Sequence, residues 1–257
     1  MPHLPTSTMV YLCSQKKKLY VTNTHITSLP DLPPYLEELH CSDNALESLP
    51  PLPPTLRVLD CHGNHLTSLP TLPPSLEKLW CYDNLLESLP NLPDTLLELL
   101  CYKNMLSSLP SLPKCLAMLS CLQNELTSLP PFPSTLCSVW CSKNQLTYLP
   151  PLPPSLRILC CPENNLRILP PFPDSVIKVR CEKNPWKPSF KLYVETDPIQ
   201  GVQDYYNELA NLKHIVKILV HLPRLFHNTD DILSHIGSYL SGKEGTCFQQ
   251  VCHWKEF

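Results

Sequence analysis

Apolar residues recur along this chain with a period of twenty residues, and no insertion interrupts the pattern from residue 29 to residue 188. In one copy the pattern places Leu76, Leu79, Cys81 and Leu86 on the same side of the chain, while the residues between them vary from copy to copy. A fixed period of this length is typical of a solenoid, in which short units stack and bury a continuous core. The sequence therefore predicts eight stacked units over this range.

Two local patterns predict the elements of each unit. The alternation in Leu79-x-Cys81 indicates a strand of about three residues that joins a parallel sheet. The Leu-Pro-x-Leu-Pro segment that follows cannot be helical, because its two prolines remove backbone donors and fix φ near about −65°. It predicts an extended, polyproline-like convex side, and most of the 31 prolines lie in such segments. We therefore expect a mostly β solenoid of the α/β type with one short parallel strand per repeat.

Cysteine occupies one fixed position of this unit. Eight of the fourteen cysteines stand there, namely Cys41, Cys61, Cys81, Cys101, Cys121, Cys141, Cys161 and Cys181. Parallel strands lie about 4.8 Å apart, whereas a disulfide brings Cβ atoms to about 3.8 Å and a zinc site converges sulfurs at about 2.3 Å from one metal. The leading, degenerate unit has Val21 at this position. We interpret the cysteines as small apolar core residues with reduced thiols, as in a cytosol-like compartment.

Asparagine follows each of these cysteines by three residues. The series is Asn44, Asn64, Asn84, Asn104, Asn124, Asn144, Asn164 and Asn184. The chain has to turn away from the strand at this point, and an asparagine amide can both donate to and accept from the backbone of adjacent turns. We expect this asparagine ladder to be architectural.

The two ends of the chain depart from the pattern. Residues 1–28 predict an N-terminal cap with one degenerate repeat, followed by eight repeats over 29–188 and a helical C-terminal segment over 189–257. Apolar residues from 204 to 221 recur at helical spacing, and a second helix is expected over 232–240.

The full repeat reads Leu-Pro-x-Leu-Pro-x-x-Leu-x-x-Leu-x-Cys-x-x-Asn-x-Leu-x-x, and it resembles the leucine-rich repeat. The match is to the shortest class of this repeat, which bacterial effector proteins of the YopM and IpaH type carry. The cysteine in place of an aliphatic residue is similar to leucine-rich repeat proteins of giant DNA viruses. The resemblance implies a right-handed horseshoe whose strands line a concave, protein-binding face.

Residues that differ between copies lie immediately before and after each ladder cysteine. They are polar toward the ends of the repeat array and apolar in its middle, where they include Trp80, Tyr82, Leu100, Tyr102, Leu122 and Trp140. Exposed aromatic residues of this kind are typical anchors of a protein interface, so we predict a partner-binding patch. The alternative is that the stacked rings only support neighbouring strands.

The C-terminal segment offers a second functional hypothesis. His221-Leu222-Pro223, Asp231 to Leu240 and Val251 to Trp254 resemble elements of the F-box, which docks the adaptor of cullin-type ubiquitin ligases. The Leu-Pro lies too far upstream, and the middle is shorter than in that motif. The segment therefore fits either a substrate-recruiting subunit of such a ligase or a helical cap for the solenoid.

Charge and composition exclude several classes of function. The net charge is −3, and the only basic run is Lys16-Lys17-Lys18, which argues against nucleic acid or an anionic membrane as partner. No apolar run reaches the roughly 18 residues of a membrane span, and the N-terminus lacks the features of a secretory signal. We expect a cytoplasmic protein, in the host cytoplasm if it acts as an effector or comes from a virus.

No catalytic constellation or cofactor motif emerges, so we predict no enzymatic activity and no cofactor. Three histidines, His40, His62 and His65, are expected to share a face with Asp43 and Asp60. Such a cluster fits either a solvated polar rim or a weak metal site.

Overall fold

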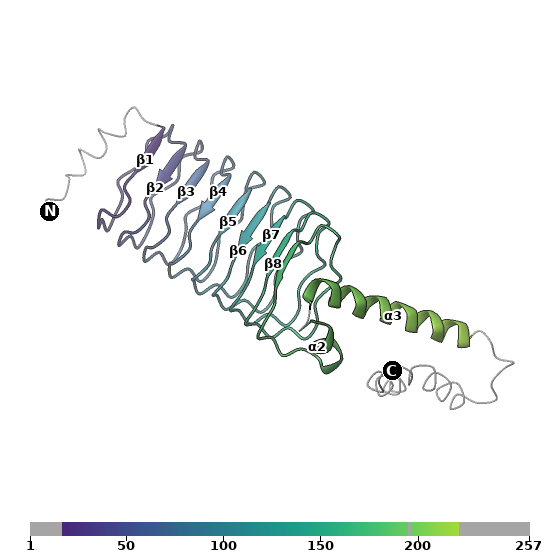
Figure 1. Cartoon of the computed structure of the whole chain (residues 1–257). Helices are drawn as coiled ribbons and strands as arrows, with labels where there is room; N and C mark the ends of the chain where they lie inside the picture. Colours follow the sequence, from purple (N-terminus) through teal and green to yellow (C-terminus); the bar gives the residue numbers. More distant parts are fainter. Residues whose placement is uncertain (1–16, 195–196, 221–257) are drawn as a thin grey trace. The chain divides into compact units, whose positions relative to one another are not determined.

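The computed structural model describes residues 17–194 and 197–220, and the chain divides into two compact units, Met1–Pro185 and Trp186–Phe257. The first unit holds the repeats. Figure 1 shows its strands side by side in chain order, joined by long non-helical connections on the other side of each unit.

Nine strands of three residues each form one parallel sheet, and each strand pairs with the next in the sequence. The register moves by twenty residues from strand to strand, so that Leu79 lies beside Leu59 and Leu99. The strands are β1 (Lys18–Tyr20), β2 (Glu38–His40), β3 (Val58–Asp60), β4 (Lys78–Trp80), β5 (Glu98–Leu100), β6 (Met118–Ser120), β7 (Ser138–Trp140), β8 (Ile158–Cys160) and β9 (Lys178–Arg180). This confirms the predicted solenoid with one short strand per repeat.

The core consists of the same four columns in all units between the two terminal ones. Leu76, Leu79, Cys81 and Leu86 are fully buried, and their equivalents in the neighbouring units are buried as well. All eight ladder cysteines lie in this core, as predicted. The leucines of the Leu-Pro segment vary: Leu89 is half-buried, whereas Leu129, Leu149 and Leu169 are buried.

The asparagine ladder joins each unit to the unit before it. The side-chain amide of Asn84 donates to the carbonyl oxygens of Cys61 and Cys81, each at 3.1 Å. Its Oδ1 accepts from the backbone N–H of Leu66 at 3.0 Å. Asn84 is 6% exposed, so these bonds satisfy backbone groups that water does not reach. The predicted architectural role is confirmed.

A second ladder of hydrogen bonds lies in the turn that precedes each strand, and the sequence reasoning missed it. The hydroxyl of Thr95 donates to the carbonyl oxygens of Pro74 and Leu76, both at 2.8 Å. The same two-carbonyl arrangement recurs at Thr55, Ser75, Thr135 and Ser155. Cys115 occupies this position in one unit and interrupts the hydroxyl ladder, because a thiol is a weak donor.

The residue before each ladder asparagine has a left-handed backbone. Its φ lies between 53° and 61° from Asp43 to Lys183, and only Gly63 among these residues is a glycine. A β-carbon disfavours this conformation by about 1–2 kcal/mol, so the asparagine bonds and the stacked units hold it in place.

The second unit is helical in most of its described part. Helix α2 (Pro188–Val194) precedes helix α3 (Pro198–Val220). Helix α3 contains the predicted apolar stripe, but it begins at Pro198 and not at residue 204, where the helical spacing of apolar residues begins. Asp197 explains the earlier start, because its Oδ1 accepts from the backbone N–H groups of Ile199 and Gln200 and Pro198 supplies a preset φ. Within the described parts of the chain, no helix is long and apolar enough to span a membrane.

The expected helix over 232–240 and all three F-box-like elements lie outside the described residues. The division into 1–28, 29–188 and 189–257 and the alternative function as a ubiquitin ligase subunit therefore stay predictions.

A candidate protein-binding face

Three columns of side chains point outward from the sheet, and together we call them the strand face. The first column contains Lys78 and its equivalents, the second contains Trp80, and the third contains Tyr82. Sequence reasoning identified the second and third columns but missed the first, although the alternation around Leu79 places Lys78 on the same side as Trp80.

All six predicted binding residues lie on the strand face and are half-buried. Trp80 pairs in register with Leu100, and Tyr82 stacks on Tyr102. Trp140 is separated from Leu100 within the second column by Ser120. The structure therefore brings the six residues to one face of neighbouring strands, without making them one uninterrupted cluster.

Tyr82 lies in a stack of three rings. The His62 and Tyr102 rings lie on either side of it, each with its centroid 4.2 Å away and within 12° of parallel. Burial and the neighbouring Tyr102 raise the pKa of the Tyr82 hydroxyl well above its usual value. Both faces of the Tyr82 ring therefore contact other rings of the same chain, which supports a structural role for this ring.

Trp80 is also engaged by its neighbours. Its indole N–H donates to Glu98 Oε2 at 3.3 Å, and Lys78 Nζ lies 5.8 Å from the ring centroid. Lys78 and Glu98 are themselves paired at 2.9 Å. The indole is therefore held by a hydrogen bond and a cation–π contact.

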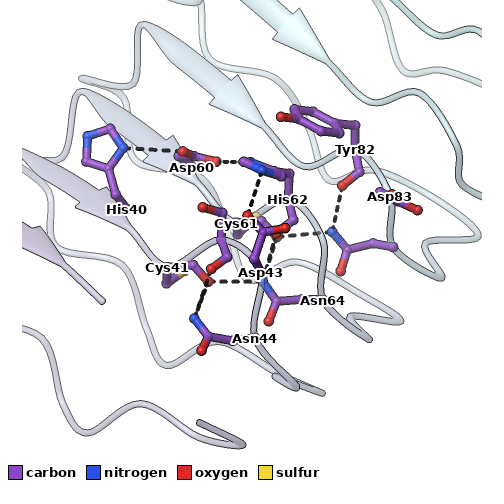
Figure 2. Close-up of polar contacts among 12 residues, drawn as sticks. His40, Cys41, Asp43, Asn44, Asp60, Cys61, His62, Asn64, Tyr82 and Asp83 are labelled. Atoms are coloured by element: carbon purple, nitrogen blue, oxygen red, sulfur yellow. Dashed lines mark hydrogen bonds and ion pairs between the residues drawn. The ribbon is translucent and has the colours of Figure 1, made fainter. Parts of the chain in front are cut away.

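Asp60 joins two histidines on the N-terminal strands, as Figure 2 shows. Its Oδ1 lies 2.6 Å from His62 Nδ1, and its Oδ2 lies 3.3 Å from His40 Nδ1. The remaining ring nitrogens face carboxylates too, at 3.4 Å from His62 to Asp43 and 3.6 Å from His40 to Glu38. Asp60 is only 7% exposed, so both imidazoles are fixed by a largely buried carboxylate.

Gly63 makes room for part of this cluster. A β-carbon at Gly63 would lie 2.5 Å from Asp43 Oδ1, so a side chain here would displace the carboxylate that faces His62. His65 does not belong to the cluster, contrary to the expectation, because its exposed side chain contacts none of these groups. The described residues contain no group of three or more side chains suited to a metal ion.

The ladder cysteines are chemically quiet. Burial raises the pKa of Cys81 and of Cys121 to about 12, so their thiolate population at neutral pH is negligible. Cys160 faces outward beside Ser142, with Sγ 3.5 Å from the serine Oγ. The ladder cysteines therefore supply packing to the core.

The strand face divides by charge. Between Glu98 and Lys178 its three columns carry no charged side chain, and we call these positions the uncharged area. The uncharged area consists of Leu100, Tyr102, Met118, Ser120, Leu122, Ser138, Trp140, Ser142, Ile158, Cys160 and Pro162. Preceding it is the paired area, whose polar and aromatic side chains contact one another: Lys18, Tyr20, Glu38, His40, Asp60, His62, Lys78, Trp80, Tyr82 and Glu98.

Repeat geometry, the buried asparagines and the parallel strands are those of a leucine-rich repeat, and comparison with known families agrees. Residues 54–94 match the family model described as leucine rich repeats, two copies. The leucine-rich repeat domain of a Shigella effector is 34% identical, with a TM-score of 0.57, over 64% of this chain and 80% of that one. This chain belongs to the leucine-rich repeat family.

Two structures of YopM are similar over a comparable part of the chain. YopM from Yersinia enterocolitica is 35% identical with a TM-score of 0.57, covering 70% of this chain and 43% of its own. YopM from Yersinia pestis, a leucine-rich effector protein, is 34% identical with a TM-score of 0.66, covering 69% and 54%. The chain thus spans about half the length of these relatives. A search of curated proteins found no match, and the similarity to repeats of giant DNA viruses stays a prediction.

Proposed function

We propose that this protein is a non-enzymatic scaffold that binds a partner protein on the strand face, which lines the concave side in this fold. The binding residues are Trp80, Tyr82, Leu100, Tyr102, Leu122 and Trp140. The observation that carries the proposal is the uncharged area, because depletion of charge and enrichment of aromatic residues characterise the centre of protein interfaces. Binding takes place in a reducing compartment such as the cytoplasm, which suits the reduced thiols.

Contribution to binding differs among the six residues. Tyr82 and Trp80 use their ring faces and polar groups internally, so they frame the site and present edges to a partner. Leu100, Leu122 and Trp140 belong to the uncharged area, where a partner replaces water without breaking an internal ion pair.

A binding experiment with two matched variants tests the proposal. Proximity labelling in the native cell identifies partners, and each is then purified and its Kd for the full chain measured. Leu122→Ala combined with Trp140→Ala should weaken binding at least tenfold. Tyr148→Ala, which removes an aromatic side chain that is 55% exposed outside the strand face, should leave it unchanged. Binding that survives the double variant, or that is lost with Tyr148→Ala, contradicts the proposal.

A further inference from the structure

The two tryptophans of the strand face are not equivalent. The Trp80 side chain is bound to Glu98 and Lys78, whereas the Trp140 side chain makes no hydrogen bond, ion pair or ring contact with any residue that the structure describes. Trp140 is half-buried, and no side-chain nitrogen in the described residues is buried without a partner. Its indole N–H is therefore open to water and available to an acceptor from outside.

Small side chains surround Trp140. Ser120 and Cys160 flank it in the second column, and Ser138 and Ser142 precede and follow it along the chain. Ser120 and Ser138 are 5% and 9% exposed, so they lie beneath the surface although they occupy outward columns. Trp140 is thus flanked by small side chains within its own column and along its own strand.

The charge in the part of the array around and beyond Trp140 is predominantly basic. Residues 129–185 contain six basic and three acidic residues, whereas residues 29–128 contain four basic and twelve acidic ones. Lys143 and Lys178 are exposed and form no ion pair with any described residue. Lys143 lies three residues after Trp140, and Lys178 begins β9, two strands further along the sheet. These cations complement a ligand that is acidic at this end.

The free indole N–H of Trp140 and the unpaired lysines favour a ligand in an extended conformation. The strands already pair with each other, so the face of the sheet offers no free ladder for β-augmentation. A helix satisfies its own carbonyls except in its last turn, whereas a polyproline-like segment leaves every carbonyl free to accept from an indole N–H. Proline rings also pack on aromatic faces in known modes of recognition.

Resting on the proposed function, we propose that Trp140 anchors an extended, acidic, proline-containing segment of the partner protein. The proline packs against the indole, and a neighbouring carbonyl accepts from its N–H. Two strand spacings cover roughly 10 Å, and a polyproline-like segment rises about 3.1 Å per residue. An acidic residue about three positions from the proline therefore reaches Lys178, and one nearer to it meets Lys143.

Selection from a displayed library of random twelve-residue peptides against the full chain tests this inference. The selected peptides should carry a proline with an acidic residue about three positions away. Synthetic copies should lose at least tenfold in affinity with Trp140→Ala and severalfold with Trp140→Phe, which keeps a ring but removes the N–H. Tyr148→Ala, outside the strand face, should change affinity by less than threefold, and Lys178→Glu should reverse the preference for acidic peptides.

Selection of no peptide, of basic peptides, or of peptides insensitive to Trp140→Ala overturns the inference. Circular dichroism and the denaturation midpoint of Trp140→Phe establish that the variants are folded. The proposed function is tested separately. If Leu122→Ala abolishes binding of a purified partner and Trp140→Phe does not, the binding face is retained and the Trp140 anchor is rejected.

Discussion

The paired area and the uncharged area are built on the same backbone, yet their side chains are used in opposite ways. In the paired area, Asp60 holds two histidines and Glu98 holds both Lys78 and Trp80. In the uncharged area, Ser120 replaces Asp60 in the same column, and the Trp140 side chain has no hydrogen bond, ion pair or ring contact among the described residues. The first area satisfies its own polar groups, whereas in the second the indole N–H of Trp140 stays open to solvent.

This difference shows that repeat position alone does not assign a role. The two areas share the cysteine core, the asparagine ladder and the hydroxyl ladder, so none of these distinguishes them. The distinction comes from pairs of outward side chains on neighbouring strands, which contact because the register is fixed.

Alkaline pH should destabilise the cysteine core that both areas share. A thiol ionises at about pH 9 when unfolded, whereas burial raises the pKa of Cys81 to about 12 in the folded chain. Each such thiol therefore contributes its full stability below about pH 9 and loses about 1.4 kcal/mol per unit as pH rises toward 12. With eight buried thiols, we expect the free energy of unfolding to fall by several kcal/mol between pH 9 and pH 10.

Hydrogen exchange over the two areas, measured from pH 8 to 10 with correction for intrinsic rates, should show them losing protection together. Replacing Cys81, Cys101 and Cys121 with valine should reduce the pH dependence, because valine has no proton to lose. A stability that stays flat to pH 10 in the native chain would contradict this account.

Asp60→Ala should break the paired area alone. The substitution leaves His40 and His62 without the carboxylate that fixes both rings, and hydrogen bonds to a charged group contribute about 1.5–3 kcal/mol. We expect a loss of about 2 kcal/mol in urea unfolding. Ser120→Ala, at the same position of the uncharged area, should change stability by less than about 0.5 kcal/mol. Equal losses in the two variants would remove the distinction.

Replacing each tryptophan with phenylalanine sharpens the comparison further. Both variants lose similar ring area, but only Trp80→Phe removes a hydrogen bond, the one to Glu98. Trp80→Phe should therefore be about 1 kcal/mol less stable than Trp140→Phe in the same denaturation experiment. A reversed order would show that Trp140 has the stronger internal contacts.

Cys115→Thr should give the smallest effect and a stabilising one. A threonine hydroxyl here reaches the carbonyl oxygens of Asp94 and Leu96 if it follows the pattern of Thr95 in the preceding unit. We expect a gain of about 0.5–1 kcal/mol, and Thr95→Val should lose a similar amount. A destabilised Cys115→Thr would mean that the thiol packs in a way that threonine cannot reproduce.

Twenty-residue spacing was enough to predict the strands, the core columns and the role of Asn84, because one unit repeated without insertion can bury its leucines only by stacking. The hydroxyl ladder is present in the sequence as a Ser or Thr that recurs at intervals of twenty residues. Its carbonyl partners lie some twenty residues earlier, so only the structure identifies them. The same reason explains why Trp80 and Trp140 looked alike, since the difference depends on Glu98, eighteen residues from Trp80.

Side-chain direction around the turn explains the misplaced histidine. His65 follows the left-handed residue Gly63 and the buried Asn64, so the chain has already left the sheet when it reaches this position. Proximity in sequence to His62 was therefore a poor guide to the face on which His65 lies.

The joint between units is asymmetric. Asn64 in one unit binds the backbone of Cys41 and Leu46 in the unit before it, and Thr55 binds the backbone carbonyls of Pro34 and Leu36. In each of these bonds the later unit contributes a side chain and the earlier unit contributes a backbone group, which is present whatever the side chains of that unit. As far as these bonds are concerned, any unit can follow any other, so duplication, loss or exchange of a sixty-nucleotide coding segment changes the strand face while leaving these backbone joints intact.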